Sequence, residues 1–172
     1  IDCIDMPRAY ELARSMGMGP VESLLKDVAT LLPLRLRPAP GEMLYTVATG
    51  RFALLTRQES RLTASWVANK LAGISADLGD GLSVALMTHT GEASFNTGEM
   101  PAQEILRRAV SALHEAITRD VASMPFSEAT DTRHTQDFTL MHDLAIAIRQ
   151  DKGLWLAYQP KICLHSGKPI GL

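Results

Sequence analysis

The segment that most constrains the fold is residues 45–55, YTVATGRFALL, in which two apolar arms flank a short polar tip. The arms, 45–47 and 52–55, have the composition of β-strands, and Gly50 at the tip tolerates the positive φ that a tight turn needs. The segment therefore predicts a two-stranded hairpin. Its tip carries a guanidinium, Arg51, and no acidic side chain.

Strand-like and helical patterns alternate around this hairpin up to about residue 120, which predicts the order βααββαβα and an α/β sandwich with helices packed on a central sheet. A capping-box pattern at 56–59 predicts the start of the third helix. The other expected elements are a strand at 1–6, helices from Pro7 to Gly17, from Pro20 to Pro33 and from Pro101 to about 118, a strand at 82–88 and a loop at 91–100.

The remainder of the chain has a different pattern. Residues 121–134 are polar and irregular, which indicates a linker, and a helix is expected over about 136–150. Residues 154–172 predict a hairpin that turns at 165–167. Because a lone hairpin is marginally stable in water, we expect it to open a second domain, and the chain to be part of a longer protein. The apolar positions expected on one side of the last helix are Phe138, Met141, Leu144, Ala145 and Ile148.

Composition limits the possible partners. Apolar residues make up 46% and charged residues 21%, as in ordinary globular domains, and a formal net charge of −2 gives no basic field for nucleic acid. No apolar run reaches the roughly 20 residues of a membrane span, so we expect no membrane contact by this fragment. Cys3 and Cys163 lie far apart and outside any CxxC, as is typical of reduced thiols. We expect a cytoplasmic protein, either free or tethered to the inner membrane through its longer parent.

Two parts of the sequence together resemble a known pair of domains. The strand–helix–helix–hairpin order, with Ala53-Leu54-Leu55 after the tip, resembles the GGDEF domain of diguanylate cyclases. Tyr158-Gln159-Pro160, followed by Gly167 and Gly171-Leu172, is similar to the opening hairpin of EAL domains, the cyclic-di-GMP phosphodiesterases. The resemblance implies a GGDEF-like domain over 1–120, a linker and connecting helix over 121–150, and the first hairpin of a truncated EAL barrel over 151–172.

The resemblance places the five-residue cyclase signature on Ala48-Thr49-Gly50-Arg51-Phe52 and the first metal ligand on Asp5, while Pro7 replaces the second aspartate of the strand motif. Family cyclases hold two metal ions between the acids of this turn and strand. Gly50 offers no ligand, and Arg51 repels a dication by roughly 4 kcal/mol per charge pair at about 4 Å in a medium of intermediate polarity. We therefore expect no catalytic residue and no metal site here, with Asp5 a vestigial metal position.

The other functional positions of the cyclase family are also changed. Its guanine-reading asparagine corresponds to Ala13 and its aspartate to Glu22, one methylene longer. The inhibitory RxxD motif falls on 39–42, which lacks the arginine. The resemblance therefore implies a domain that keeps the hairpin for its fold and makes no cyclic-di-GMP.

Three side chains have alternative interpretations. Arg51 either grips a phosphate or is a solvated turn residue, and the second is the simpler interpretation. Asp5 either is a relic ligand or caps the helix that begins at Pro7, which we favour. Gln159 either contacts cyclic-di-GMP through its amide, as the resemblance implies, or is a polar strand-end residue. The five histidines show no metal-ligand spacing, and Arg107 and Arg108 are expected to be solvated charges.

These inferences predict a part of a bacterial cyclic-di-GMP signalling protein. Its inactive GGDEF-like domain would be a regulatory or dimerisation module, or would bind GTP weakly, in a possible homodimer. The EAL domain would hydrolyse cyclic-di-GMP to linear pGpG with water activated by Mg²⁺ or Mn²⁺, although this fragment itself is expected to hold no cofactor. One alternative is a non-catalytic cyclic-di-GMP receptor in which both domains are degenerate. Another is that residues 1–120 form an unrelated α/β regulatory sandwich.

Overall fold

The computed structural model describes residues 1–5, 9–77, 83–85 and 87–171. The chain forms two compact units, residues 1–128 and 129–172. The division into domains at 120 and 150 remains a prediction. The first compact unit continues eight residues beyond the expected boundary.

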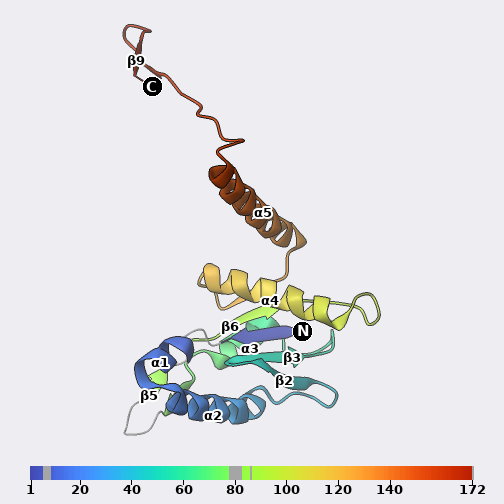
Figure 1. The fold of residues 1–172 in the computed structure, drawn as a ribbon. Helices are drawn as coiled ribbons and strands as arrows, with labels where there is room; N and C mark the ends of the chain where they lie inside the picture. The colour runs from blue at the N-terminus through green and yellow to red at the C-terminus, as the bar shows by residue number, and fades with distance from the viewer. Residues whose placement is uncertain (6–8, 78–82, 86, 172) are drawn as a thin grey trace. The chain divides into compact units, whose positions relative to one another are not determined.

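The first unit contains strands and helices in the expected order, with short strands added (Figure 1). The elements are β1 (Asp2–Asp5), α1 (Ala9–Met16), α2 (Met18–Leu36), β2 (Met43–Ala48), β3 (Arg51–Leu55), α3 (Ala64–Leu71), β4 (Ser75–Asp77), β5 (Ser83–Ala85), β6 (His89–Glu92), α4 (Ala102–Thr118) and β7 (Ser123–Pro125).

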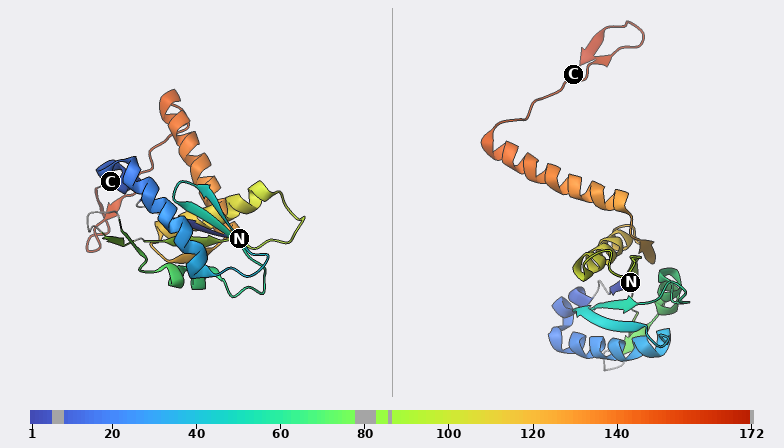
Figure 2. Two further views of the ribbon diagram at one scale, coloured as in Figure 1. Left: turned by 90° about the horizontal axis from the view of Figure 1, so that it is seen from below. Right: turned by 90° about the vertical axis from the view of Figure 1, so that its right-hand side faces the viewer.

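The central sheet has five strands in the order β2-β3-β1-β6-β7. Its neighbours are antiparallel except for β6 and β7, which are parallel. Helix α2 lies on one side of the sheet and α4 on the other, as Figure 1 and the right-hand view of Figure 2 show. The described residues thus confirm a mixed α/β fold with helices packed on a central sheet. The hairpin expected at 45–55 is β2–β3.

The main core lies between α2, α3 and the sheet. In β1, Ile4 stands opposite Phe52 of β3 and Thr90 of β6, so that these side chains share one face. That face is covered by the apolar stripe of α2. The fully buried members of the cluster are Ile4, Leu24, Val28, Leu32, Leu36, Phe52, Leu54, Leu62, Val67, Leu71 and Ile74.

Helix α2 corrects one expectation, because it does not end at Pro33. It continues to Leu36, and Arg37 closes it in the left-handed conformation with its N–H donating to the Pro33 carbonyl oxygen. A proline in the last turn removes only one helical hydrogen bond. Burial of Leu36, which is fully inaccessible to solvent, compensates for that loss.

Helix α3, in contrast, is shorter than expected. It begins at Ala64, where the hydroxyl of Thr63 accepts a hydrogen bond from the Trp66 N–H, and not at the capping-box pattern of 56–59. It ends at Leu71, and Ser75–Asp77 form β4 in place of further helix. In the sequence, the apolar residues with helical spacing continue through Ile74. In the structure Ile74 lies after the end of the helix, but its side chain still packs in the main core.

The strand expected at 82–88 differs most from the structure. Among these residues, Ser83–Ala85 form β5, which pairs with β4 in a separate two-stranded sheet, whereas 82 and 86 lie outside the described residues. The central strand beside β1 is instead β6, His89–Glu92, of which 91–92 were expected to be loop. Similarly, β7 forms within the expected linker, and α5 (Glu128–Gln150) starts eight residues before the expected helix.

The second unit contains α5 from residue 129 and the short hairpin of β8 (Lys161–Ile162) and β9 (Pro169–Gly171). The hairpin confirms the expected reversal around 165–167, but residues 154–160 are not in a strand. In the described part of the chain, no helix is long and apolar enough to cross a bilayer.

Gly91 in β6 allows α4 to lie directly against the sheet. A Cβ at this position would overlap the backbone nitrogen of Leu113 and the carbonyl oxygen of Ala109, and would lie 2.6 Å from the Leu113 Cα. These are backbone atoms, so no side-chain rearrangement could make room. The position therefore requires glycine because of space, and any larger residue would displace α4.

Asp2 is a buried carboxyl group on the core face of β1. Its side chain stands opposite Glu92, and its Oδ1 has no hydrogen-bond partner among the described residues. Burial raises the pKa of Asp2 to about 7; the amino group of Ile1 lowers it, and Glu92 raises it further. The folded state therefore favours the neutral carboxylic acid.

This shift predicts a pH-dependent stability. A pKa raised in the folded state contributes stability that is complete below the ordinary pKa of 3.8 and is lost as the pH rises through about 7. Asp2→Asn removes the titration, so the free energy of unfolding of the variant should exceed that of the wild type increasingly from pH 4 to pH 8, by roughly 2–4 kcal/mol at the upper end. Urea denaturation at several pH values measures this difference.

The control for this measurement is Glu59→Gln at an exposed loop position, which should leave the wild-type pH profile unchanged. Parallel stability curves for the wild type and the Asp2→Asn variant would contradict the assignment.

Candidate functional site

The candidate site lies at the tip of the β2–β3 hairpin, where the signature-like residues were expected. Ala48 ends β2 and pairs with Arg51, the first residue of β3, so that Thr49 and Gly50 form the turn. Gly50 has a φ of 71°, which is the conformation expected for it from the sequence. Phe52 is buried in the main core and holds the base of the tip in place.

Asp5 and Arg51 face each other across β1 and β3. They are directly opposed in the antiparallel ladder, so both side chains lie on the same face of the sheet. Arg51 Nε donates to Asp5 Oδ1 over 3.3 Å, and the Asp5 side chain is mostly buried while that of Arg51 is about one-third exposed. Arg51 is therefore the ion-pair partner of Asp5, which corrects its interpretation as a solvated turn residue.

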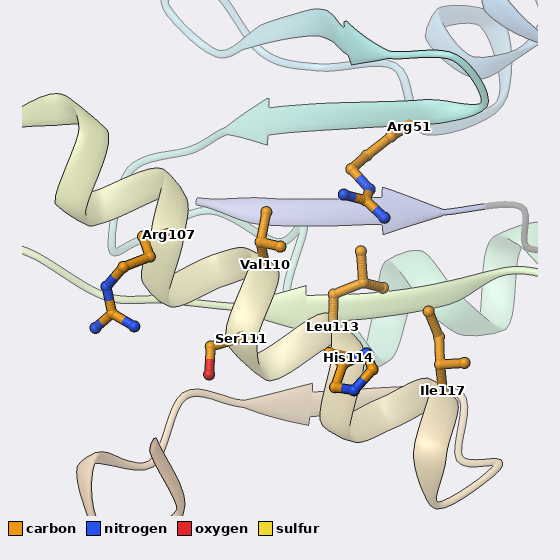
Figure 3. Close-up of a pocket in the computed structure, with 7 residues that line it drawn as sticks. All are labelled: Arg51, Arg107, Val110, Ser111, Leu113, His114 and Ile117. Carbon is orange, nitrogen blue, oxygen red and sulfur yellow. The ribbon is translucent and has the colours of Figure 1, made fainter. Parts of the chain in front are cut away.

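A shallow pocket of about 380 Å³ adjoins Arg51. Figure 3 shows the Arg51 side chain extending across β1 toward α4, which supplies the other lining residues. These residues are Arg107, Val110, Ser111, Leu113, His114 and Ile117. The pocket is thus lined by both apolar and polar side chains, as ligand sites commonly are.

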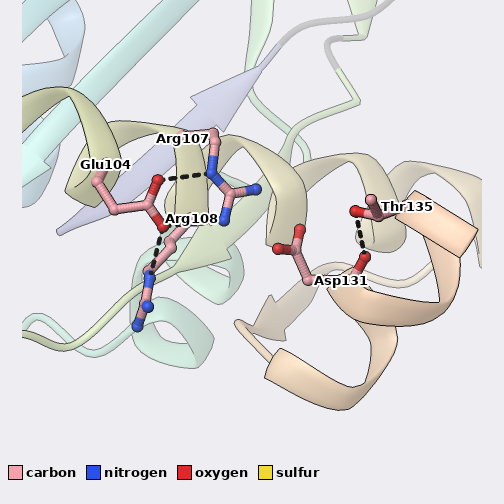
Figure 4. A network of polar contacts seen from close by, with 5 residues as sticks. All are labelled: Glu104, Arg107, Arg108, Asp131 and Thr135. Carbon is pink, nitrogen blue, oxygen red and sulfur yellow. Dashed lines mark hydrogen bonds and ion pairs between the residues drawn. The ribbon is translucent and has the colours of Figure 1, made fainter.

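The two arginines of α4 are held by a carboxylate on the preceding turn. Arg107 Nε donates to Glu104 Oε2 over 2.7 Å, and Arg108 Nε donates to Glu104 Oε1 over 3.0 Å (Figure 4). These hydrogen bonds lower the pKa of Glu104 to about 2. The Arg108 guanidinium also lies 5.0 Å from the centre of the Phe126 ring. Both arginines therefore have defined partners. Arg107 is exposed, as expected for a solvated charge, whereas Arg108 is half-buried.

The site does not fit a pair of metal ions. In the described ranges no three His, Cys, Asp or Glu side chains are grouped so that they could hold a metal. Asp5 is the carboxylate at the expected position, and it already accepts a hydrogen bond from a guanidinium. A hard dication would have to displace Arg51 and would then find one carboxylate, fewer oxygen ligands than such sites normally supply.

No family model matches the chain. The chain is similar to the cyclic di-GMP phosphodiesterase PA2567 of Pseudomonas aeruginosa, with 32% identity over 142 residues, or 77% of this chain and 23% of that protein. It thus spans about a quarter of the relative's length. Its structure resembles the crystal structure of the GGDEF domain of the same PA2567 protein, with a TM-score of 0.61, 19% identity, and coverage of 73% of this chain and 81% of that one.

A second solved structure resembles this chain to a similar degree. It is the GGDEF domain of DgcB from Caulobacter crescentus in complex with c-di-GMP, with a TM-score of 0.61 and 14% identity, covering 72% of this chain and 73% of that chain. This chain has the fold of a GGDEF domain. The expectation drawn from the hairpin and the element order is therefore confirmed for the fold.

Within the GGDEF fold, the other expected positions have the following places. Ala13 is half-buried on α1 and Glu22 is exposed on α2. Residues 39–42 form a tight turn in which the Ala39 N–H donates to Glu42 Oε2 over 2.7 Å. Gln159 is exposed within 154–160, apart from any strand. The cap that Asp5 was expected to provide at Pro7 lies outside the described residues.

The part of the site that α4 contributes was not predicted from the sequence. Ser111 and His114 line the pocket, although the histidines show no metal-ligand spacing in the sequence. The available signal was helical spacing: 107, 111 and 114 lie on one face of a helix, next to the apolar stripe that packs on the sheet. That spacing indicates a polar rim beside a buried face.

The Asp5–Arg51 pair should contribute a measurable coupling energy. In a double-mutant cycle with Asp5→Asn and Arg51→Met, we expect a coupling of about 1 kcal/mol in the free energy of unfolding, because the pair is mostly buried on one side and partly exposed on the other. Urea denaturation of the four proteins measures it. Lys26→Met, at an exposed position of α2, is the matched loss of a cation and should show no coupling to Asp5→Asn. Purely additive effects of the two site variants would contradict the assignment.

Proposed function

We propose that this chain is part of a cyclic-di-GMP signalling protein in which the GGDEF-fold unit has a regulatory or dimerisation role and makes no cyclic-di-GMP. The GGDEF fold supports the signalling context, and so does the similarity to a protein named as a cyclic di-GMP phosphodiesterase. The observation that carries the loss of cyclase activity is the hydrogen bond from Arg51 to Asp5.

The chemistry of cyclisation explains why this ion pair is decisive. Joining two GTP molecules requires a 3′-hydroxyl to attack an α-phosphate, and metal ions normally stabilise the developing charge in such reactions. At this hairpin a fixed cation is bound to the carboxylate that would hold the metal. The half-buried methyl group of Ala13 also has no donor or acceptor for a guanine edge. We also propose that the unit binds GTP weakly, without a metal at Asp5 and without a guanine contact from Ala13.

The C-terminal residues suggest the activity of the longer protein. The proposal assigns them to the opening hairpin of an EAL domain that hydrolyses cyclic-di-GMP to linear pGpG with Mg²⁺ or Mn²⁺, and assigns Gln159 to contact with the dinucleotide. The β8–β9 reversal and the exposed amide of Gln159 are compatible with this assignment. The GGDEF neighbour solved with c-di-GMP supports that dinucleotide as the ligand class.

The first test is for cyclase activity. The purified 172-residue chain, incubated with GTP and either Mg²⁺ or Mn²⁺, should form no cyclic-di-GMP by chromatography, because the metal position is held by an ion pair. The Gly50→Asp/Arg51→Glu double variant should also remain inactive, since Ala13 is unchanged. Product from the wild-type chain would refute the proposal, and product from the double variant alone would refute the role given to Ala13.

The second test separates an enzyme from a receptor and uses the whole protein that contains this chain. We expect it to convert cyclic-di-GMP to pGpG in the presence of Mg²⁺ or Mn²⁺. Gln159→Ala should raise KM, because an amide contact to the ligand is lost, whereas Lys161→Ala at a nearby exposed position should not. Binding of cyclic-di-GMP without any turnover would favour the alternative, a non-catalytic receptor.

A further inference from the structure

Helix α5 carries a row of exposed apolar side chains. Phe138, Met141 and Ile148 are 76%, 66% and 62% exposed, and the small residue Ala145 completes the row. None of the described residues of α5 is buried. The views of Figures 1 and 2 show α5 as one continuous helix. An exposed apolar row on a helix indicates a surface that another element or partner covers.

The spacing of the row indicates what covers it. Residues 138, 141, 145 and 148 are separated by three, four and three positions, which is the a/d pattern of a coiled coil, with a mean period of 3.5. Leu144, which the sequence places on the same side, flanks this row at one edge. Residues 138, 141, 145 and 148 therefore form the centre line of a seam, which suits another helix of the same kind.

We propose that this seam binds α5 of a second copy of the chain, in a parallel two-stranded coiled coil. The proposal deepens the dimerisation role suggested above and rests on it for its biological meaning. The association itself can be measured without nucleotide, so the two proposals can fail separately.

The residues beside the seam favour the parallel orientation. With 138 and 145 at a positions, Asp137 and Leu144 occupy g positions and His142 and Arg149 occupy e positions. In a parallel pair, g residues meet e residues of the partner five positions further on. Asp137 would then accept a hydrogen bond from His142 of the partner subunit, and Leu144 would cover the stem of the partner's Arg149.

The antiparallel orientation has no such complementarity. There, e positions meet e positions, so that His142 would face Arg149 of the partner subunit, and Asp137 would face the partner's Leu144. One contact places an imidazole against a cation, and the other desolvates a carboxylate beside an apolar side chain. The charges on α5 therefore select the parallel dimer.

The length of the seam limits its strength. Asp131 and His134 continue the same spacing toward the N-terminal end of α5 and are polar, so the apolar part covers about two heptads. We expect a reversible dimer, populated at high protein concentration. Sedimentation equilibrium over a range of concentrations should therefore show the mass rising from 18.7 kDa toward twice that value.

Two neighbouring residues provide a matched test of the seam. Met141 and Leu140 are each 66% exposed, but Met141 lies on the seam and Leu140 lies outside it. Met141→Glu should weaken the dimer by at least about tenfold, whereas Leu140→Glu should leave it within about twofold of the wild type. Circular dichroism should show that both variants keep their helix content. Equal weakening by both variants, or a wild-type chain that stays monomeric, would overturn the proposal.

A charge change distinguishes the two orientations. His142→Glu would place a carboxylate opposite Asp137 of the partner subunit in the parallel dimer and should weaken it. In an antiparallel dimer it would meet Arg149 of the partner subunit and strengthen the association. Adding Asp137→Lys to His142→Glu should restore the parallel dimer, because Lys and Glu then face each other. Strengthening by His142→Glu alone would overturn the parallel arrangement.

Discussion

Helix α4 and strand β6 meet backbone to backbone at Gly91, and the arrangement of the site depends on that contact. Because no side chain separates them, α4 lies close enough for Leu113 and Ala109 to be buried against the sheet. The same close approach brings the polar face of α4 beside the hairpin tip, where Arg51 and His114 line one pocket. The absence of a side chain at Gly91 thus determines which residues of α4 can form the site.

At the hairpin tip the geometry of the fold is retained while the chemistry differs from that of a metal site. The ladder still sets residue 51 opposite Asp5, so any charged side chain at position 51 acts on the carboxylate at short range. An acid there would repel Asp5 and require a cation between them. A guanidinium supplies the positive charge itself, which stabilises the strand pair without an ion. The proposed loss of catalysis and the stability of the hairpin therefore have the same cause.

The sequence predicted those elements whose burial depends on large apolar side chains or on turn chemistry. The hairpin at 45–55, the strand of β1 and helices α1 and α4 are of this kind. It did not predict β6, because that strand is HTGE and its burial comes from a glycine, a threonine and a histidine whose Nδ1 donates to the Val121 carbonyl oxygen. The start of α3 was missed because two possible caps, Thr56 and Thr63, precede it, and only tertiary packing selects Thr63. The Asp5–Arg51 pair depends on strand register, which spacing along the chain does not reveal.

Strand β7 has a mechanical consequence for the polypeptide. It is three residues long, it lies at the edge of the sheet beside β6, and only Phe126 and Ser127 separate it from the first residue of α5. Tension or torque transmitted along α5 therefore reaches the sheet through this strand first. Few hydrogen bonds resist it, among them the one from the Phe126 N–H to the Glu92 carbonyl oxygen. Under load, strand β7 would thus detach first from the sheet, while the four remaining strands stay paired.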